Sequence, residues 1–238
     1  MKERVFGYRA LERQMVAMRQ GMRVLDIGCG VGENLGRFVR YGGKPMGIDP
    51  SFARVQRAQS YAPAAVARGE ALPYADGCFE MVYISHVLHH ASDVAAVLRE
   101  SHRVLVSGGV LFLLESVDDS PLMRLARAVQ PRWEKDEVTN RFRFAQLERV
   151  VQAHGFEVCD GATFNWIYFI WELLPLAFRP FEIFTPLVVG LEVALRRRLN
   201  RFGGHCWLVA QKPGESVLGG LPPLIAAARR PHSRPRSR

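Results

Sequence analysis

The sequence has few of the features that mark a secreted, metal-binding or membrane-spanning protein. Its cysteines form no Cys-x-x-Cys pair and have no spacing typical of zinc ligands. They are Cys29, Cys78, Cys159 and Cys206. We therefore expect reduced thiols in a cytoplasmic protein. The first twenty residues lack the apolar segment of a signal peptide. No uncharged run reaches the roughly eighteen residues of a spanning helix.

Positive charge is concentrated near the end of the chain. The 238 residues have a formal net charge of +9, and the stretch from Lys212 onwards holds six basic residues and one acid, which is +5 of that total. Residues 213–238 are also rich in Pro, Gly and Ser, so we expect a disordered basic tail after one domain over residues 1–212. The tail is either simply solvated or attracted to an anionic membrane surface. No basic patch interleaved with aromatics precedes it, so we expect no nucleic acid partner.

The most informative stretch begins with a short apolar run, Val24 to Ile27. Such a run is typical of a strand that is buried on both faces of a parallel sheet. Glycines follow at alternate positions, Gly28, Gly30 and Gly32, and a helix is predicted over 32–41. Glycine permits positive φ and close approach of a ligand, and a helix start presents free N–H groups. A strand, a glycine turn and a helix in this order begin a nucleotide-cofactor unit.

Three acids narrow the choice of cofactor. The dinucleotide fingerprint needs a glycine where this chain has Glu33, so that fingerprint is absent. Asp26 lies near the end of the buried strand, where a carboxylate is unfavourable unless it is paired or faces a polar ligand. A cationic ligand would suit it. Asp49 ends the next predicted strand and can accept hydrogen bonds from both hydroxyls of a ribose.

Five motifs resemble those of class I S-adenosylmethionine (SAM) dependent methyltransferases, and in particular the quinone-biosynthesis C-methyltransferases. They are Val24–Gly32, Gly47–Ser51, Leu72–Tyr74, Phe79–His90 and Arg103–Leu111. The cofactor of that family carries an ammonium and a sulfonium and no phosphate, which fits the acid at Asp26. The resemblance covers roughly residues 20–160 and the last predicted strand.

The resemblance implies an α/β fold with a Rossmann-like, doubly wound sheet of seven strands. The last strand is expected to run antiparallel between strands five and six, after an apolar helical insert over 164–201. We expect strands over residues 22–27, 45–49, 64–67, 79–84, 110–115, 156–163 and 205–211. Helices are expected over residues 3–20, 32–41, 52–61, 92–106 and 141–154.

The resemblance also implies a SAM site at the carboxyl edge of the sheet. Its expected residues are Asp26, Gly28, Cys29, Gly30, Gly32, Asp49, Pro50, Gly69, Glu70, Ala71 and Ser85. In the family, an acid in the loop before the Leu-Pro motif helps to hold the adenine. This chain has Arg68 where that acid usually stands. The contact with the adenine amino group is therefore expected from backbone or from Glu70.

Three histidines follow the fourth predicted strand, His86, His89 and His90. Each is a candidate general base for a hydroxyl or an activated carbon, because histidine titrates near neutral pH. The plainer interpretation is that one lines the site and the others pack or cap. Their spacing is not that of a zinc site and no nearby Cys or acid completes one, so we expect no metal. The Asn/Asp-Pro-Pro-Tyr motif of nucleobase amino methylation is absent.

The insert at 164–201 is unusually apolar for a connection between strands, and Arg196–Arg198 lie near its end. Two interpretations stay open: an interfacial hairpin on a membrane, or a helical lid or dimer face over the substrate. The insert favours a small lipophilic acceptor, such as a quinone or polyprenyl phenol, for an enzyme that is cytoplasmic or peripheral at the inner face of the membrane. The alternative is a non-catalytic SAM-binding protein that the insert tethers to a membrane or a partner. The oligomeric state stays open.

Overall fold

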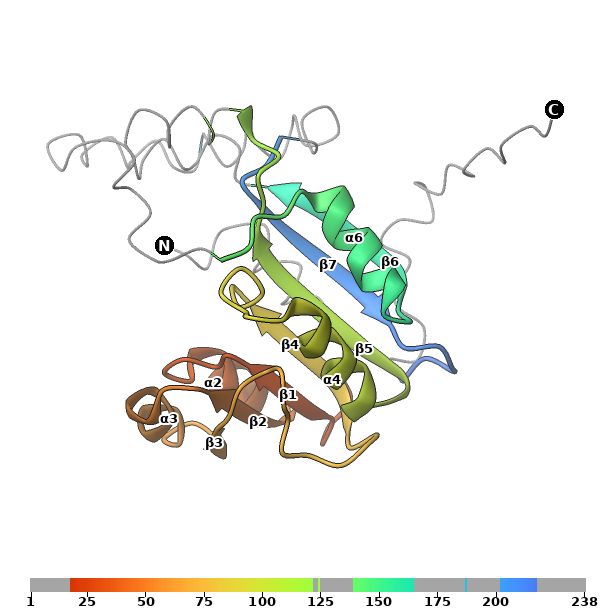
Figure 1. Cartoon of the computed structure of the whole chain (residues 1–238). Coiled ribbons are helices and arrows are strands. Elements are labelled where there is room, and N and C mark those ends of the chain that lie inside the picture. The colour runs from red at the N-terminus through yellow and green to blue at the C-terminus, as the bar shows by residue number, and fades with distance from the viewer. Residues whose placement is uncertain (1–17, 122–123, 125–138, 165–186, 188–201, 218–238) are drawn as a thin grey trace, which may run out of the picture.

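A seven-stranded sheet forms the centre of the molecule (Figure 1). The computed structural model describes residues 18–121, 124, 139–164, 187 and 202–217. The strands are β1 (Arg23–Ile27), β2 (Lys44–Asp49), β3 (Ala64–Val66), β4 (Phe79–Ser85), β5 (Leu105–Ser116), β6 (Glu157–Phe164) and β7 (His205–Gln211). The helices are α2 (Glu33–Arg40), α3 (Phe52–Ala58), α4 (Val94–Val104) and α6 (Phe144–Ala153).

The strand order is β3-β2-β1-β4-β5-β7-β6. Strands β1 to β5 pair in parallel, and β7 runs antiparallel to both of its neighbours, β5 and β6. The predicted Rossmann-like sheet, with its last strand antiparallel between the fifth and sixth, is therefore confirmed. The chain leaves β1 in one direction towards β2 and returns on the other side as β4, which makes the crevice at the end of β1 a ligand site in folds of this kind.

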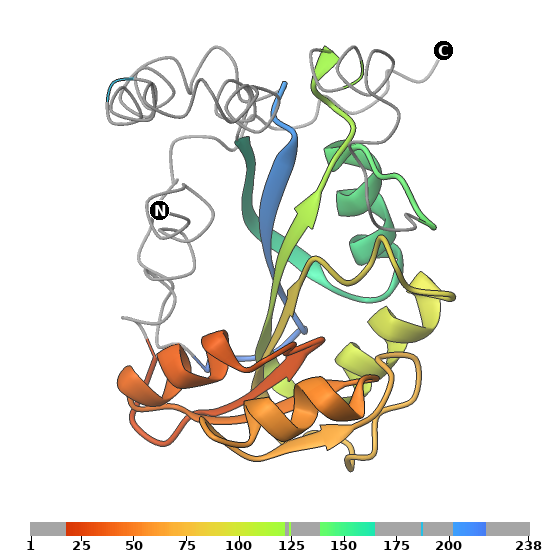
Figure 2. The same cartoon turned by 90° about the vertical axis from the view of Figure 1, so that its left-hand side faces the viewer.

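Helices cover both faces of the sheet, as Figure 2 shows. On one face α4 and α6 pack against a core that includes Leu25 and Ile27 of β1. On the other face Phe38 of α2 and Val24 of β1 belong to a second buried cluster. Consecutive residues of β1 thus point to opposite sides and both are buried, which is why this strand reads as a continuous apolar run in the sequence.

The junction between α4 and β5 differs from its prediction. The helix ends at Val104 and the strand already begins at Leu105, whereas we expected a helix to 106 and a strand from 110. Leu105 pairs with Phe79 at the start of β4, and a register shift then accommodates the Ser-Gly-Gly stretch within the strand. The pair of glycines that looks like a helix end is therefore an irregularity inside β5, where Gly108 has a φ of +75°.

The folded part extends past the predicted boundary at residue 212. Ser107 donates from Oγ to Pro213 O, and the Val217 N–H donates to Gly108 O. The Val217 side chain packs on the core cluster that contains Phe38. Residues 213–217 thus lie against β5, and the rest of the predicted tail is outside the described residues.

Two further predictions concern residues that are largely outside the described ones. They are the first helix, over residues 3–20, and the apolar insert at 164–201. Phe164, the first residue of the predicted insert, is the last residue of β6. No described helix combines the length and the hydropathy of a membrane span.

Candidate active site

The glycine turn joins β1 to α2 at the carboxyl edge of the sheet. Gly28, Gly30 and Gly32 all have positive φ, at +73°, +56° and +90°. A Cβ on Gly28 would overlap the Val87 side chain, and one on Gly32 would lie 2.7 Å from Ala58 Cα. At Gly30 a Cβ would meet nothing within 4 Å. Two of the glycines thus allow close packing of protein on protein, whereas Gly30 borders open space.

Asp26 is buried at the end of β1, with 1% of its surface exposed. Its Oδ2 atom accepts no hydrogen bond from any described residue. Burial, and next the charge of Asp49, raise the pKa of Asp26 well above its usual value. A buried carboxylate oxygen without a partner is costly in a folded protein, and a cationic ligand would relieve that cost. The residue therefore fits the ammonium of SAM.

Asp49 lies at the end of β2 and holds the glycine turn in place. Its Oδ2 accepts from the Gly30 N–H at 3.1 Å, and its Oδ1 accepts from the Ser51 N–H at 2.9 Å. The Arg54 guanidinium lies 3.9 Å from Oδ2. Each carboxylate oxygen can accept a second hydrogen bond. The ribose contact predicted for Asp49 stays a prediction, and Pro50 beside it is exposed.

The loop after β3 carries the remaining predicted cofactor residues. Gly69 packs closely, since a Cβ there would lie 3.0 Å from Ile27 Cγ2. Glu70 Oε1 accepts from the N–H and the Oγ of Ser92, at 3.0 and 2.8 Å, just before α4. Burial raises the pKa of Glu70, but these hydrogen bonds outweigh it and the pKa is lowered. Because Glu70 is engaged with Ser92, the backbone around Ala71 becomes the better candidate for the adenine contact.

Two residues of α4 fasten this loop, and sequence reasoning missed both. Arg103 donates to the carbonyl oxygens of Leu72 and Tyr74, at 3.1 and 2.7 Å. Glu100 accepts from the Leu72 N–H at 2.8 Å and is paired with Arg103 at 2.7 Å. The predicted adenine loop is therefore held in shape by a charged pair on a helix that follows it in the chain.

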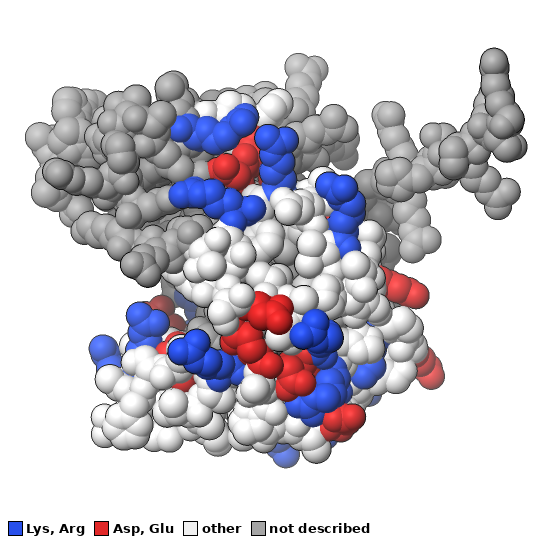
Figure 3. Space-filling view, viewed as in Figure 1, with Lys and Arg blue, Asp and Glu red and all other residues white. Residues whose placement is uncertain are grey.

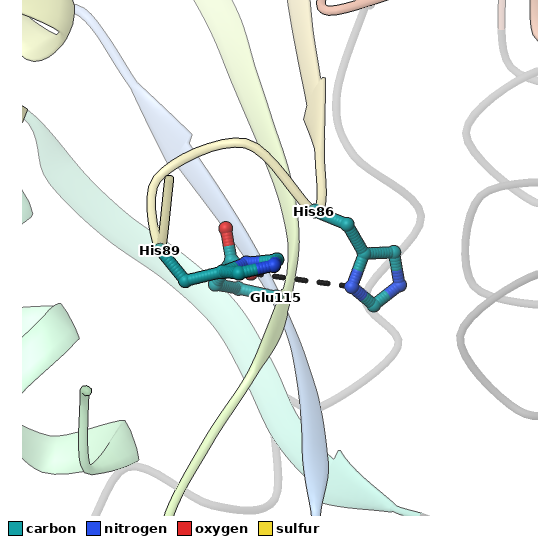
Figure 4. Close-up of side chains that lie close together, drawn as sticks. All are labelled: His86, His89 and Glu115. Carbon is teal, nitrogen blue, oxygen red and sulfur yellow. Dashed lines mark hydrogen bonds and ion pairs between the residues drawn. The ribbon is translucent and has the colours of Figure 1, made fainter. Parts of the chain in front are cut away.

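The histidines after β4 adjoin a buried carboxylate that sequence reasoning also missed. Glu115, near the end of β5, is 1% exposed and is hydrogen-bonded to His89 Nδ1. His86 Nδ1 lies 4.0 Å from the same Oε1 atom. Figure 4 shows both imidazoles close to Glu115. The expectation that no acid stands near these histidines is therefore wrong.

The register of the sheet explains the error. Ser85, the last residue of β4, pairs with Leu114 of β5, so the residues that follow each strand meet at one edge. In the sequence, Glu115 is a single acid at the end of an apolar run, 26 positions from His89. His90 is exposed, and its ring lies 3.9 Å from that of His89. The structure thus gathers all three histidines at the edge that also holds the glycine turn.

The doubly wound sheet with an antiparallel last strand carries a glycine turn and a buried acid at its carboxyl edge, where folds of this kind bind their ligands. Residues 25–113 match the family described as "Methyltransferase domain". Over these residues the chain is therefore similar to SAM-dependent methyltransferases, and the acids and glycines at the carboxyl edge of its sheet fit SAM as the cofactor.

Curated relatives include methyltransferases of quinone biosynthesis. The chain is 35% identical over 142 residues to the ubiquinone/menaquinone biosynthesis C-methyltransferase UbiE of Acidiphilium cryptum, covering 54% of this chain and 55% of that protein. It is 28% identical over 174 residues to the ubiquinone biosynthesis O-methyltransferase of Azorhizobium caulinodans, covering 65% of this chain and 67% of that protein. The chain thus spans about half to two thirds of the length of these relatives.

Among solved structures, the chain is similar to the [4+2]-cyclase SpnF. The TM-score is 0.61 at 25% sequence identity, and the match covers 86% of this chain and 81% of that one. The name of that protein describes a cyclase rather than a methyltransferase. The fold by itself therefore does not establish which reaction this chain catalyses.

Proposed function

We propose that this protein transfers the methyl group of SAM to a small lipophilic acceptor, at a hydroxyl or an activated carbon. The observation that carries the cofactor part of the proposal is the buried Oδ2 atom of Asp26, which accepts no hydrogen bond from any described residue. The acceptor half is supported by the two quinone-biosynthesis relatives and by the apolar residues of 164–201.

SAM supplies a methyl group on a sulfonium. In-line attack by the acceptor forms the new bond to the methyl carbon and breaks the S–C bond, so that S-adenosylhomocysteine is released. The acceptor's proton goes to solvent. The protein contributes mainly by holding the two reactants in line at close distance. Asp26, the glycine turn and Asp49 would hold the cofactor. His86, His89 and His90 are the candidates for the residues that act on the acceptor.

The lipophilic acceptor leads to a second part of the proposal, peripheral membrane association. Residues 164–201 would supply the apolar contact, and Arg196–Arg198 with the basic C-terminal stretch would supply attraction to anionic lipid. The acceptor would then reach the site from the lipid side of the protein. On this proposal the working enzyme would lie at the inner face of a cell membrane.

The alternative function is SAM binding without methyl transfer, with the insert as a tether. The similarity to a structure named as a cyclase is the observation that favours it. Turnover of SAM separates the two, because only methyl transfer releases S-adenosylhomocysteine in proportion to a methylated product.

The test uses the purified full chain with SAM and, separately, a lipid extract and a water-soluble extract of cells. We expect S-adenosylhomocysteine to form with the lipid extract, together with a lipid that gains the mass of one methyl group. Asp49→Ala is the matched control, because it removes acceptor oxygens from the cofactor edge and should weaken SAM by about 1–3 kcal/mol.

Two outcomes contradict the proposal in different ways. If the water-soluble extract alone supports turnover, the acceptor is polar and the membrane argument falls with the lipophilic one. If SAM binds but neither extract yields more S-adenosylhomocysteine than Asp49→Ala does, the chain is a SAM-binding protein without methyl transfer under these conditions and the alternative replaces the proposal.

A further inference from the structure

His86, His89 and Glu115 bring three metal-ligating atoms together at the carboxyl edge of the sheet (Figure 4). One ring nitrogen of each histidine and one carboxylate oxygen of Glu115 lie within 4.8 Å of one another. The histidines come from the loop after β4 and the glutamate from the adjacent strand β5. We infer that these three residues form a binding site for one divalent transition-metal ion, and that this ion holds the oxygen of the methyl acceptor.

The carboxylate of this site is rigidly placed. Glu115 is 1% exposed, its Oε2 accepts from the Leu88 N–H at 2.9 Å, and its Oε1 accepts from the Ser116 N–H at 2.9 Å. Metal sites depend on such outer hydrogen bonds, which orient the ligands and are nearly as important as the ligands themselves. A buried carboxylate also requires a cation or hydrogen-bond donors nearby. Here the donors fix the orientation and the imidazoles complete the surroundings.

The backbone at His86 is the second sign of a built site. His86 has a φ of +55°, the only positive φ of a residue other than glycine among the described residues. Its N–H donates to Leu114 O at 2.8 Å, which continues the pairing of β4 with β5 for one residue. Residues other than glycine are rarely held in this region, and such residues cluster at functional sites. The turn sets the ring of His86 beside Glu115 rather than along the strand.

The ligand set selects the kind of ion. Two imidazole nitrogens and one carboxylate oxygen suit Zn²⁺, Co²⁺, Fe²⁺ or Ni²⁺, whereas Mg²⁺ and Ca²⁺ prefer oxygen ligands. Bonds of about 2.0–2.1 Å require neighbouring ligand atoms about 3.3 Å apart. His86 Nδ1 is 4.0 Å from Oε1, with 37% of its side chain exposed, so it can move inward. At His89 the ion would replace the direct hydrogen bond to Glu115.

The open side of the site gives it a role in the proposed reaction, and this inference rests on that proposed function. Three protein ligands leave at least one position free for another oxygen. An ion there would bind the acceptor's hydroxyl oxygen and lower its pKa, so that the proton is released to solvent before the methyl group is transferred. His86 and His89 would then be ligands rather than proton acceptors. The acceptor class becomes a phenol or enol with an oxygen that can coordinate a metal.

The experiment measures metal binding directly and needs neither SAM nor an acceptor. The full chain, without a histidine tag, is stripped with a chelator and titrated with Zn²⁺ by calorimetry and with Co²⁺ by visible absorption. We expect one ion per chain, and a Co²⁺ spectrum of low coordination number. His86→Ala should weaken Zn²⁺ by more than the about 10–100-fold that an outer-shell change causes. Glu115→Gln should have the same effect.

His154→Ala is the control, because His154 lies at the end of α6 and its Nδ1–H donates locally, to Val150 O. It should leave Zn²⁺ binding unchanged. The SAM affinity of each variant reports whether its fold is intact. His86→Ala removes only a partly exposed ring, so this variant still tests the metal site if Glu115→Gln fails to fold.

The inference is overturned if Zn²⁺ and Co²⁺ do not bind, or if they bind equally well to His86→Ala and to the wild type. If the wild type binds no metal and His89→Ala still abolishes methyl transfer, then His89, oriented by Glu115, is a general base and the two residues are not metal ligands. Absence of methyl transfer with normal metal binding would instead refute the proposed function and leave the metal site standing.

Discussion

Asp26 is a residue that favours ligand binding but lowers the stability of the protein without its ligand. Its carboxylate is fully buried and one oxygen has no described partner. Replacement by a neutral residue would remove the burden of burying a charge, so the acid is best explained by what it does in the complex. Stability given up at a binding site for the sake of the ligand is a common arrangement.

The first prediction concerns the pH dependence of SAM binding. The pKa of Asp26 is raised, so its carboxylate becomes protonated as the pH falls through that raised value, and SAM affinity should fall with it. Asp26→Asn should abolish this dependence and weaken SAM at neutral pH by about 1.5–3 kcal/mol, the usual contribution of a hydrogen bond to a charged group. Calorimetry from mildly acidic to neutral pH measures both effects.

Asp26→Asn should weaken SAM binding but increase the folding stability of the protein. Because the folded pKa of Asp26 lies above its unfolded value, the wild type loses stability as the pH rises through the folded pKa. Asp26→Asn should therefore gain thermal stability relative to the wild type towards neutral pH. The other titratable group that raises the pKa of Asp26 is Asp49. In Asp49→Asn the pH dependence should persist and move to lower pH; a pH-independent wild type would refute the role of Asp26.

At the scale of elements, α4 controls the shape of a loop that precedes it in the chain. Arg103 is bonded to two carbonyl oxygens of the loop, to Glu100 and to Asp76 at 2.8 Å. The pKa of Arg103 is raised, first by the hydrogen bond to Glu100 and then by that to Asp76. The planar fork of a guanidinium can reach all four partners at once, whereas an ammonium cannot.

We therefore predict that Arg103→Lys loosens residues 71–76 even though it keeps the charge. Amide hydrogen exchange of this loop should become faster, and SAM affinity should fall by about tenfold because the adenine side of the site is no longer held. The lost hydrogen bonds should lower the free energy of unfolding by about 1–3 kcal/mol.

Arg99→Lys is the matched control on the same helix. Arg99 is exposed and pairs only at 3.6 Å with Asp93, so its replacement should change stability by less than about 0.5 kcal/mol. Equal exchange rates for the loop in Arg103→Lys and in the wild type would show that the loop keeps its shape without α4.

At the scale of the whole molecule, the connection between β6 and β7 leaves the sheet and returns to it at the same edge. Phe164 at the end of β6 pairs with His205 at the start of β7, so the two ends of the connection are neighbours. On the face shown in Figure 3, basic and acidic side chains of the described residues lie intermixed. The described part of that face therefore offers no obvious anionic-membrane surface, and the proposal of membrane association rests on the insert and the tail.

We predict that residues 165–201 can be replaced by a short Gly/Ser turn without loss of the fold, because β6 and β7 form an antiparallel pair on their own. The full chain should sediment with anionic vesicles, less so at high salt, and the shortened chain should stay in solution. Thermal unfolding and SAM binding check that the shortened chain is folded.

The control for charge is the triple variant Arg196→Gln, Arg197→Gln and Arg198→Gln. It should keep the apolar contact and lose salt-sensitive binding, by about 1 kcal/mol for each residue near the surface. A full chain that ignores vesicles and is a dimer, with a monomeric shortened chain, would make the insert a dimer face and contradict the membrane proposal.

Residue patterns along the chain are enough to predict the sheet and its cofactor edge. A short apolar run, alternate glycines and an acid at the end of each of the first two strands are local signals, because burial on both faces and positive φ restrict residue type at single positions. The place of the last strand, antiparallel between strands five and six, followed from the resemblance to a known class, and the structure confirms it.

The surroundings of the histidines and of the predicted adenine loop depend instead on how the strands and helices pack together. Glu115 meets His86 and His89 because β4 and β5 pair in one register, and Arg103 reaches Leu72 and Tyr74 because α4 packs across the sheet beside them. A strand register and a helix position are set by the sum of many weak packing contacts, so no single residue in the sequence predicts them. That is why a lone acid in an apolar strand looked unremarkable, and why in the fold it becomes the centre of a candidate metal site.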